Sequence, residues 1–340
     1  MNDLPNILNY SLLNKAEFLK AVQKPCVMIL PLSAPENHGD HLPLGTDYII
    51  AEALAKRISD FFAQQNPEWN VLIHPVWPLG GATIRGAGSL KVRYWMLRKL
   101  LVSYGSRICS QGIRGLVIVS GHGGVGHVMA IEDACKILNR RYSSMGFQAI
   151  APGAKLATKV YAGHYVSRWA DVGVRISDSI ANDLAVDLHA GFLETSIMKF
   201  LLPQYYENKN WSMPEKLIAH RPWWMAIMGN FFVSLIKWLP FSSERRDEII
   251  FGIQLGATDL AWVLQGRKEG YLGDPAVSDP NVGRVLLDTM AEDFAQIMHQ
   301  VFLLGKNPKT FFSFIGYIRP ALWICLIIFL GLAALITCFL

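Results

Sequence analysis

The amino-acid sequence predicts an α/β fold in which helices flank a mainly parallel central sheet, with a hydrophobic insertion and a C-terminal transmembrane helix. Three observations predict this fold. Short apolar runs alternate with longer segments that carry apolar residues at helical spacing, as in successive βαβ units. Polar clusters follow two of the apolar runs, where open parallel sheets place their ligands. The chain also ends in a long segment without any charged residue.

The first half of the chain supplies the sheet. The short apolar runs that are typical of buried strands lie at 26–32, 71–76, 116–119 and 147–150. The segments with helical spacing lie at 9–22, 46–65, 90–111 and 127–139. Thr46 stands where a side-chain cap would begin the second of these helices. Because a helix lies between successive strands, we expect parallel pairing and right-handed crossovers.

The second half is expected to complete the domain with helices. The predicted features are a helix that ends at 202, an insertion rich in Trp and Phe at about 208–246, a Gly-Asp-Pro turn within 270–275 and a last helix at 282–303. Neither an internal repeat nor a low-complexity segment separates these features. We therefore expect one α/β domain over residues 1–310, which contains the insertion, and a membrane-associated segment over 311–340.

Composition narrows the class of protein. The chain has 340 residues, of which 51% are hydrophobic and 17% charged, and its net charge is +5. Lysines and arginines are scattered rather than grouped in a stripe, so no nucleic-acid partner is expected. None of the five cysteines forms a CxxC pair, which favours buried free thiols in a reducing compartment over disulfides.

The end of the chain predicts a membrane anchor. The segment 321–340 carries no charge and is long enough to span a hydrocarbon core as a helix. Lys306, Lys309 and Arg319 precede it, and no charged residue follows it, so the positive-inside rule places the globular part in the cytoplasm. The insertion around 223–239 is also apolar, and we expect an interfacial helix in contact with membrane lipid. A lid and an oligomer contact remain the alternatives for this insertion.

A polar cluster after the first strand is typical of a metal site. Glu36 and His38 are two residues apart, so an extended backbone directs both side chains to one side. Asp47 returns at the start of the following helix, where the helix dipole favours a carboxylate. Two carboxylates and an imidazole that converge on one point form a common ligand set for a divalent metal ion.

A glycine-rich loop after the third strand, at 121–126, allows two interpretations. It matches the G-x-G-x-x-G pattern of dinucleotide-binding turns. The acidic residue that would hold the ribose is missing from the end of the next strand, and His122 would crowd a pyrophosphate. The alternative is that the glycines allow a tight turn that directs His122 toward a metal ion.

His189 and Glu194 lie at the start of a later helix. A capping histidine and a surface glutamate would explain them without any functional role. However, the residues between and beside them are small or apolar, so both polar groups are expected inside the protein. A buried glutamate requires a partner, and a metal ion would supply one.

Three motifs in order resemble the creatininase family of metal-dependent amidohydrolases. They read Glu36-x-His38-Gly39-x-His41-Leu42-Pro43-x-Gly45-x-Asp47, Ser120-Gly121-His122-Gly123-Gly124 and His189-Ala190-Gly191-x-x-Glu194-Thr195-Ser196. The resemblance covers about residues 25–200, and the Gly-Asp-Pro turn near 273 is similar to a late turn of the family. It implies a central parallel sheet, a homo-oligomer and two divalent metal ions, with zinc or manganese favoured and iron as a further candidate.

The resemblance also assigns roles to single residues. It implies that Glu36, Asp47 and His122 hold one ion, while His38 and the shared Asp47 hold the other together with an acid. In creatininase itself that acid lies two residues after the matching histidine, where this chain has a glycine, so Glu194 is the expected replacement ligand. His189 matches the catalytic histidine, and Glu194 is counted with it as a catalytic candidate.

One departure from the family pattern concerns the substrate. The family often has a Glu-His pair before a Gly-Thr turn, whereas residues 80–90 of this chain read Gly-Gly-Ala-Thr-Ile-Arg-Gly-Ala-Gly-Ser-Leu. This segment helps to shape the pocket, so the departure counts against creatinine as the substrate.

The expected function is therefore hydrolysis of an amide-type C–N bond at a membrane surface, with a metal-activated water as the nucleophile. The substrate would be a small molecule or a peptide, and an apolar one if the insertion lies in the membrane interface. Two alternatives stay open: a peptidase that trims a modified peptide, and a metal-binding scaffold without catalysis.

Overall fold

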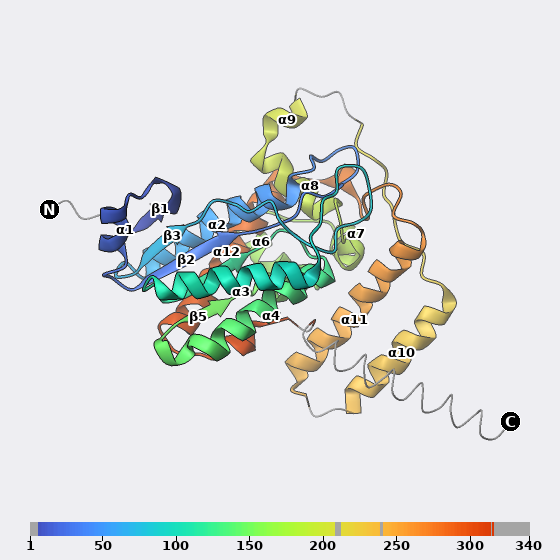
Figure 1. Ribbon diagram of the computed structural model, residues 1–340. Helices are drawn as coiled ribbons and strands as arrows, with labels where there is room; N and C mark the ends of the chain where they lie inside the picture. Colours follow the sequence, from blue (N-terminus) through green and yellow to red (C-terminus); the bar gives the residue numbers. More distant parts are fainter. Residues whose placement is uncertain (1–5, 208–211, 239–240, 314, 316–340) are drawn as a thin grey trace, which may run out of the picture.

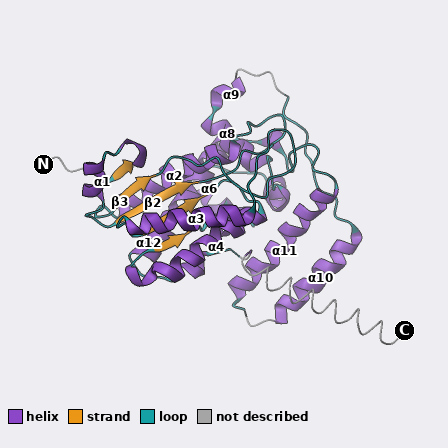
Figure 2. Cartoon of the chain, in the orientation of Figure 1, coloured by secondary structure: helices purple, strands orange, loops and turns teal. Residues whose placement is uncertain are grey.

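The computed structural model describes residues 6–207, 212–238, 241–313 and 315 (Figure 1). The described residues form one five-stranded sheet in the order β1-β3-β2-β4-β5, and every neighbouring pair is parallel (Figure 2). The strands are β1 (Ile7–Asn9), β2 (Cys26–Pro31), β3 (Asn70–Ile73), β4 (Gly115–Val119) and β5 (Gln148–Ile150). This arrangement confirms the predicted α/β fold with a parallel central sheet.

Helices cover both faces of this sheet (Figure 1). The α-helices are α1 (Lys15–Ala21), α2 (Thr46–Gln65), α3 (Tyr94–Ser110), α4 (Val125–Tyr142), α5 (Gly153–Tyr161), α6 (Val166–Asp171), α7 (Asp178–Asp183), α8 (Phe192–Leu201), α9 (Pro203–Glu207), α10 (Trp223–Trp238), α11 (Ser243–Leu264) and α12 (Pro280–Phe302). Short 3₁₀ turns lie at η1 (Tyr10–Leu12), η2 (Ser143–Met145), η3 (Leu184–Val186), η4 (Pro275–Val277) and η5 (Pro308–Phe311).

Two hydrophobic cores follow from the alternation of side chains along β2. Val27 and Ile29 point to one face and pack with residues of α2, α8 and α12. Met28 and Leu30 point to the opposite face and pack with residues of α3 and α4. Every residue of β2 is buried, as expected for a central strand of a parallel sheet with helices on both sides.

The N-terminal region differs from the prediction. Instead of one helix over 9–22, the structure has strand β1, turn η1 and the seven-residue helix α1. Asn14 rather than an apolar stripe defines the start of α1, since its side chain and that of Glu17 form a capping box. Thr46 was wrongly expected to cap α2: it is the first helical residue, and its hydroxyl donates a hydrogen bond to the carbonyl of Pro43.

Helices α10 and α11 form a hairpin beside the main domain (Figure 1). The predicted insertion at 208–246 is thus the first part of a longer helical unit that ends at Leu264. Several large apolar side chains of α10 face solvent, among them Trp223, which is 77% exposed, and Phe231, which is 61% exposed.

Two further predictions concern the membrane anchor and the cysteines. None of the helices in the described ranges combines the length and apolar character needed to cross a membrane, and the anchor expected at 321–340 lies outside those ranges. Cys26, Cys109 and Cys135 are free and buried, as predicted. The other two cysteines also lie outside the described residues.

Candidate metal centre

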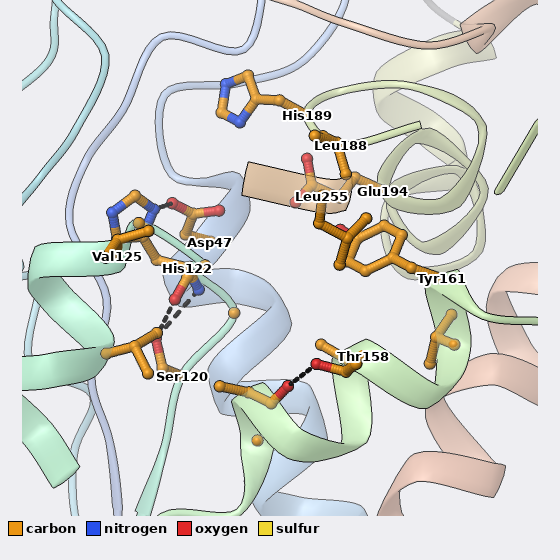
Figure 3. A pocket seen from close by; sticks show the side chains of 18 of the residues that line it. Asp47, Ser120, His122, Val125, Thr158, Tyr161, Leu188, His189, Glu194 and Leu255 are labelled. Carbon is orange, nitrogen blue, oxygen red and sulfur yellow. Dashed lines mark hydrogen bonds and ion pairs between the residues drawn. The ribbon is translucent and has the colours of Figure 1, made fainter. Parts of the chain in front are cut away.

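The predicted site residues converge at the carboxyl ends of two neighbouring strands. Glu36 and His38 follow β2, and Asp47 lies in the first turn of α2. His122 follows β4, the strand that pairs with β2. Glu194 reaches the same place from the first turn of α8, as Figure 3 shows together with Asp47 and His122 around one cavity. Three segments far apart in the sequence therefore form one polar cluster.

The first group consists of His122, Glu36 and Asp47, and all three side chains are buried. Nε2 of His122 lies 2.9 Å from the carbonyl oxygen of Gly81, which can only accept a hydrogen bond, so Nε2 carries a proton. The other ring nitrogen, Nδ1, faces Glu36 Oε2 at 2.8 Å and Asp47 Oδ2 at 3.1 Å. Neither oxygen receives a well-directed hydrogen bond from the described residues. These three atoms need a cation among them, either a proton on Nδ1 or a metal ion.

The second group repeats this arrangement with His38, Asp47 and Glu194. Nδ1 of His38 lies 3.0 Å from the backbone carbonyl of Glu36, so this nitrogen is the donor. Nε2 faces Asp47 Oδ1 at 3.1 Å and Glu194 Oε2 at 3.6 Å. Asp47 thus presents one carboxylate oxygen to each histidine, which is the geometry of a carboxylate that bridges two cations.

Electrostatics favours a cation in both groups. Burial disfavours a charge on His38, but the carboxylates of Asp47 and Glu194 outweigh burial and raise the pKa of His38 to about 9. Burial raises the pKa of Glu194 to about 7, against the opposing effect of His38. Burial also disfavours a charge on His122, yet its bonds to Asp47 and Glu36 raise its pKa. Imidazole and carboxylate ligands of this kind suit divalent zinc or manganese, so the residues fit the predicted metal ions.

His189 lies beside the second group, and its ring is 4.2 Å from the ring of His38, centroid to centroid. Nε2 of His189 lies 2.8 Å from the backbone carbonyl of Asn37 and is therefore the protonated nitrogen. Burial and the nearby His38 lower the pKa of His189 to about 4. Its imidazole is therefore neutral at pH 7, and Nδ1 is an acceptor.

Asp187 is a supporting residue that the sequence patterns did not single out. Its buried carboxylate accepts hydrogen bonds from the backbone N–H groups of Phe192 and Leu193, the first residues of α8. A Cβ atom at Gly191 or Gly273 would lie 1.9 or 2.0 Å from Asp187 Oδ1. The position of this carboxylate therefore explains why Gly191 of the His-Ala-Gly motif and Gly273 of the Gly-Asp-Pro turn carry no side chain. Its hydrogen bonds also fix the start of α8, the helix that carries Glu194.

His127 is a second supporting residue whose role the sequence patterns did not predict. Its Nδ1 accepts a hydrogen bond from the N–H of Gly81, and its Nε2 lies 3.0 Å from the hydroxyl of Ser120. This contact positions the Gly81 backbone, whose carbonyl fixes the tautomer of His122. The sequence does place His127 shortly after His122, at the start of a helix. Nothing in the sequence distinguishes His127 from an ordinary core histidine.

The glycine-rich loop serves close packing around His122. A Cβ at Gly124 would lie 2.6 Å from His122 Nε2 and 2.8 Å from the carbonyl oxygen of Ala82, so no acidic side chain fits there. A Cβ at Gly121 would lie 2.4 Å from the Asp47 carbonyl oxygen. These contacts explain Gly121 and Gly124 without a dinucleotide and leave Glu194 as the third acid of the cluster.

A cavity of about 490 Å³ adjoins the cluster (Figure 3). Glu36, Asp47, His122, His189 and Glu194 line its polar end. Elsewhere the lining is mainly apolar, and α11 supplies part of the wall, so the insertion contributes directly to the pocket.

Comparison with known proteins shows the family and the fold. Residues 11–298 match the family model "Creatininase: Creatinine amidohydrolase". A solved creatinine amidohydrolase (creatininase) shares the fold with a TM-score of 0.57 at 18% identity, over 88% of this chain and 99% of that chain. A mutant creatininase described as Zn-Zn type gives a TM-score of 0.58 at 17% identity, over 88% of this chain and 100% of that chain.

Curated relatives carry a different name. The mycofactocin precursor peptide peptidase of Mycobacterium tuberculosis (strain CDC 1551 / Oshkosh) is 29% identical over 190 residues, which are 54% of this chain and 62% of that protein. The protein of the same name from Mycobacterium ulcerans (strain Agy99) is 33% identical over 141 residues, 40% of this chain and 54% of that protein. The match thus spans less than two thirds of either relative. Because the family model matches most of the chain, this protein belongs to the creatininase family.

Proposed function

We propose that this chain is a metal-dependent hydrolase of an amide-type C–N bond. The observation that carries the proposal is the position of Asp47, whose two carboxylate oxygens each face a histidine whose tautomer is fixed by a backbone carbonyl. Glu36 and His122 would complete one metal site, and His38 and Glu194 the other. Bound divalent ions supply a water of lowered pKa and polarise the scissile carbonyl.

The chain's own residues provide the rest of the reaction. Hydrolysis breaks the C–N bond, forms a C–O bond from water and transfers a proton to the leaving nitrogen. His189 is the proposed proton carrier, because its Nδ1 is unprotonated at pH 7 and the ring lies against the cluster. Glu194 is also proposed as an acid–base candidate for the state in which it does not hold an ion, because burial raises the pKa of its carboxyl to about 7.

We propose two ions per chain, with zinc or manganese favoured and iron as a further candidate. The two groups of ligand atoms that share Asp47 support the number. The names of two structural neighbours, "Creatininase Mn" and a mutant creatininase of "Zn-Zn type", support the choice of metal. The family resemblance further suggests that the chain forms a homo-oligomer.

A peptidase that trims a modified peptide is the second candidate. The names of the curated relatives favour it, although the matched part covers only 62% of the first of them. Both candidates are amide hydrolases, so they share the cluster and differ in what the cavity accepts. A metal-binding scaffold without turnover is the third.

We also propose that the protein works at a membrane surface from the cytoplasmic side. The exposed apolar residues of α10 support contact with lipid, and the uncharged segment 321–340 supports an anchor. Lys306 and Lys309 precede that segment and support the orientation.

The test is elemental analysis of the purified full chain, followed by profiling of small amides and peptides with the metal-loaded protein. We expect close to two divalent ions per chain and release of a carboxylic acid and an amine. Full metal loading without hydrolysis of any amide or peptide would instead support the scaffold.

A further inference from the structure

The cavity next to the cluster extends far beyond the polar groups. One face of α4 lines it with Val125, Val128, Ile131 and Glu132, which follow one another at intervals typical of a single helix face. From the first to the last of these residues the helix rises about 10 Å. We call the part of the cavity away from the cluster the apolar chamber.

The walls of the apolar chamber come from five helices. Its apolar lining residues are Ile50 and Leu54 of α2, Val128 and Ile131 of α4, Ala157 and Val160 of α5, Leu255 of α11, and Leu286, Leu287 and Met290 of α12. The volume of about 490 Å³ lies within the roughly 300–1,000 Å³ of pockets that enclose most of a small-molecule ligand. A substrate as small as the polar cluster itself would leave most of these apolar walls without contact.

Two hydroxyl groups that line the cavity already have hydrogen-bond partners. The hydroxyl of Thr158 donates to the Ala154 carbonyl, and that of Ser120 lies within hydrogen-bond distance of Ser33 and His127. An extended peptide would bring one donor and one acceptor per residue, and burying them without partners is unfavourable. A hydrocarbon chain has no such groups.

The end of the cavity next to the cluster is polar, unlike the apolar chamber. Nε1 of Trp262 is a buried donor without a hydrogen-bond partner among the described residues, and the Trp262 ring lies 5.5 Å from the ring of His189. This N–H and the carboxylate–histidine cluster suit an amide group. Glu132, about two turns into α4, is the exception in the apolar chamber: among the described residues its Oε2 has no hydrogen-bond partner and lies 3.8 Å from Lys136 Nζ.

We infer that the substrate is an amide with a long hydrocarbon chain, which occupies the apolar chamber while the amide lies at the metal cluster. This inference rests on the proposed function and names its substrate class. The hairpin adjoins both regions, because α11 lines the cavity and packs against α10, which carries the exposed apolar side chains.

Gly256 provides a sharp test. It lies on α11, lines the cavity, and a Cβ at this position would meet no atom within 4 Å. Gly256→Phe should reduce the space in the apolar chamber, because its Cβ has open surroundings, and removing a glycine from a helix favours folding. Gly229→Phe is the matched control, since Gly229 lies on α10 with equally open surroundings and does not line the cavity. Ala157→Phe fills the apolar chamber from α5 as a second variant.

The experiment uses the full chain in phosphatidylcholine nanodiscs, with empty nanodiscs as the blank. It compares acetyl, butanoyl, hexanoyl and octanoyl para-nitroanilides, the corresponding N-alkyl acetamides, and a tripeptide para-nitroanilide. We expect kcat/KM to rise by about threefold to fourfold per methylene on one side of the amide. Gly256→Phe and Ala157→Phe should lower the octanoyl-to-acetyl ratio at least tenfold, and Gly229→Phe should not change it.

Binding of octanamide and acetamide to chelator-treated protein, measured by calorimetry, separates the apolar chamber from catalysis. Tighter binding of octanamide that Gly256→Phe abolishes would support the apolar chamber, and it would do so even if no amide were hydrolysed and the proposed function failed. Equal binding of the two amides, or faster cleavage of the tripeptide than of the octanoyl substrate, would overturn the inference.

Discussion

The metal cluster and the α10–α11 hairpin are built on opposite principles. In the cluster, buried carboxylates and histidines face one another, and backbone carbonyls fix the orientation of two histidine rings. In the hairpin, large apolar side chains face outward; Trp224 and Ile227 are exposed although both are apolar. Each region thus reverses the usual rule that apolar side chains are buried and charged ones exposed.

The contrast separates chemistry from substrate selection. We propose that the cluster determines the kind of reaction, since it contains the residues of the three motifs that resemble the family. We propose that the hairpin determines what reaches the cluster, since it supplies a wall of the cavity and an exposed apolar face. Changes in the cluster should therefore abolish turnover for every substrate, whereas changes in the hairpin should alter location and preference.

The largest effect is expected from Asp47→Ala. Because Asp47 contacts both histidines, its removal should release both metal ions and abolish measurable turnover. The loss of metal affinity should exceed the roughly 10–100-fold typical of residues behind the ligands. Elemental analysis checks this, with His122→Ala as the comparison, which should lose mainly one ion. Full metal occupancy in Asp47→Ala would disprove the bridging role.

His189→Ala should reduce turnover by about 10²–10⁴-fold while the metal content stays unchanged, since a general acid–base group contributes about this much. The variant should remain folded, because His189 is only partly buried and makes its side-chain hydrogen bond to one backbone carbonyl. The measurement is kcat together with metal content. A fall in metal content that parallels the fall in kcat would indicate that His189 is a metal ligand instead.

The exposed face of α10 is expected to matter for membranes but not for metal binding. In a protein without residues 320–340, changing Trp223, Trp224, Phe231 and Phe232 to Ser should weaken sedimentation with lipid vesicles by about 100-fold or more, since each buried aromatic contributes about 2 kcal/mol. Metal content should not change. Leu12→Ser, an equally exposed apolar change near the sheet edge, is the control. A tail-deleted protein that never binds vesicles would contradict this role.

The smallest effect is expected at Glu132, a buried residue of α4 that lines the apolar chamber. Burial raises the pKa of Glu132 from 4.5 to about 6. The carboxyl is therefore protonated in folded and unfolded protein below pH 4.5, and ionised in both above pH 6, where burial of the charge destabilises the fold. Glu132→Gln should raise the free energy of unfolding by about 2 kcal/mol at pH 8 and change it little at pH 4. Urea unfolding at both pH values tests this, and an equal effect at both would contradict it.

Sequence patterns predicted the parts of the molecule that have a strong local signal. Helix α2 begins and ends where its apolar spacing does, and the strands that precede the site are short buried runs. Strand β1 was missed because three residues carry no periodicity and pair only through β3. Helices α5, α6 and α7 were also missed, because they have six to nine residues each.

The candidate site shows the same division. The six residues from Glu36 to Glu194 that the motifs single out do lie together, and their roles stay predictions. The supporting residue Asp187 and the Gly81 carbonyl were not visible in the sequence, because their contribution depends on which backbone groups they meet. The apolar chamber could not be predicted either, since its lining residues occupy ordinary core positions on five separate helices.

The central place of β2 has a consequence for motion. Its backbone pairs with β3 on one side and β4 on the other, and Glu36 and His38 follow directly from it. Amide hydrogens of such a strand usually exchange with solvent only when the whole domain unfolds, whereas a peripheral helical pair can open separately at lower cost. We therefore expect the hairpin to open more readily than the strand that leads into the ligand atoms. Deuterium uptake should accordingly be slow over Val27 to Leu30 and fast over α10.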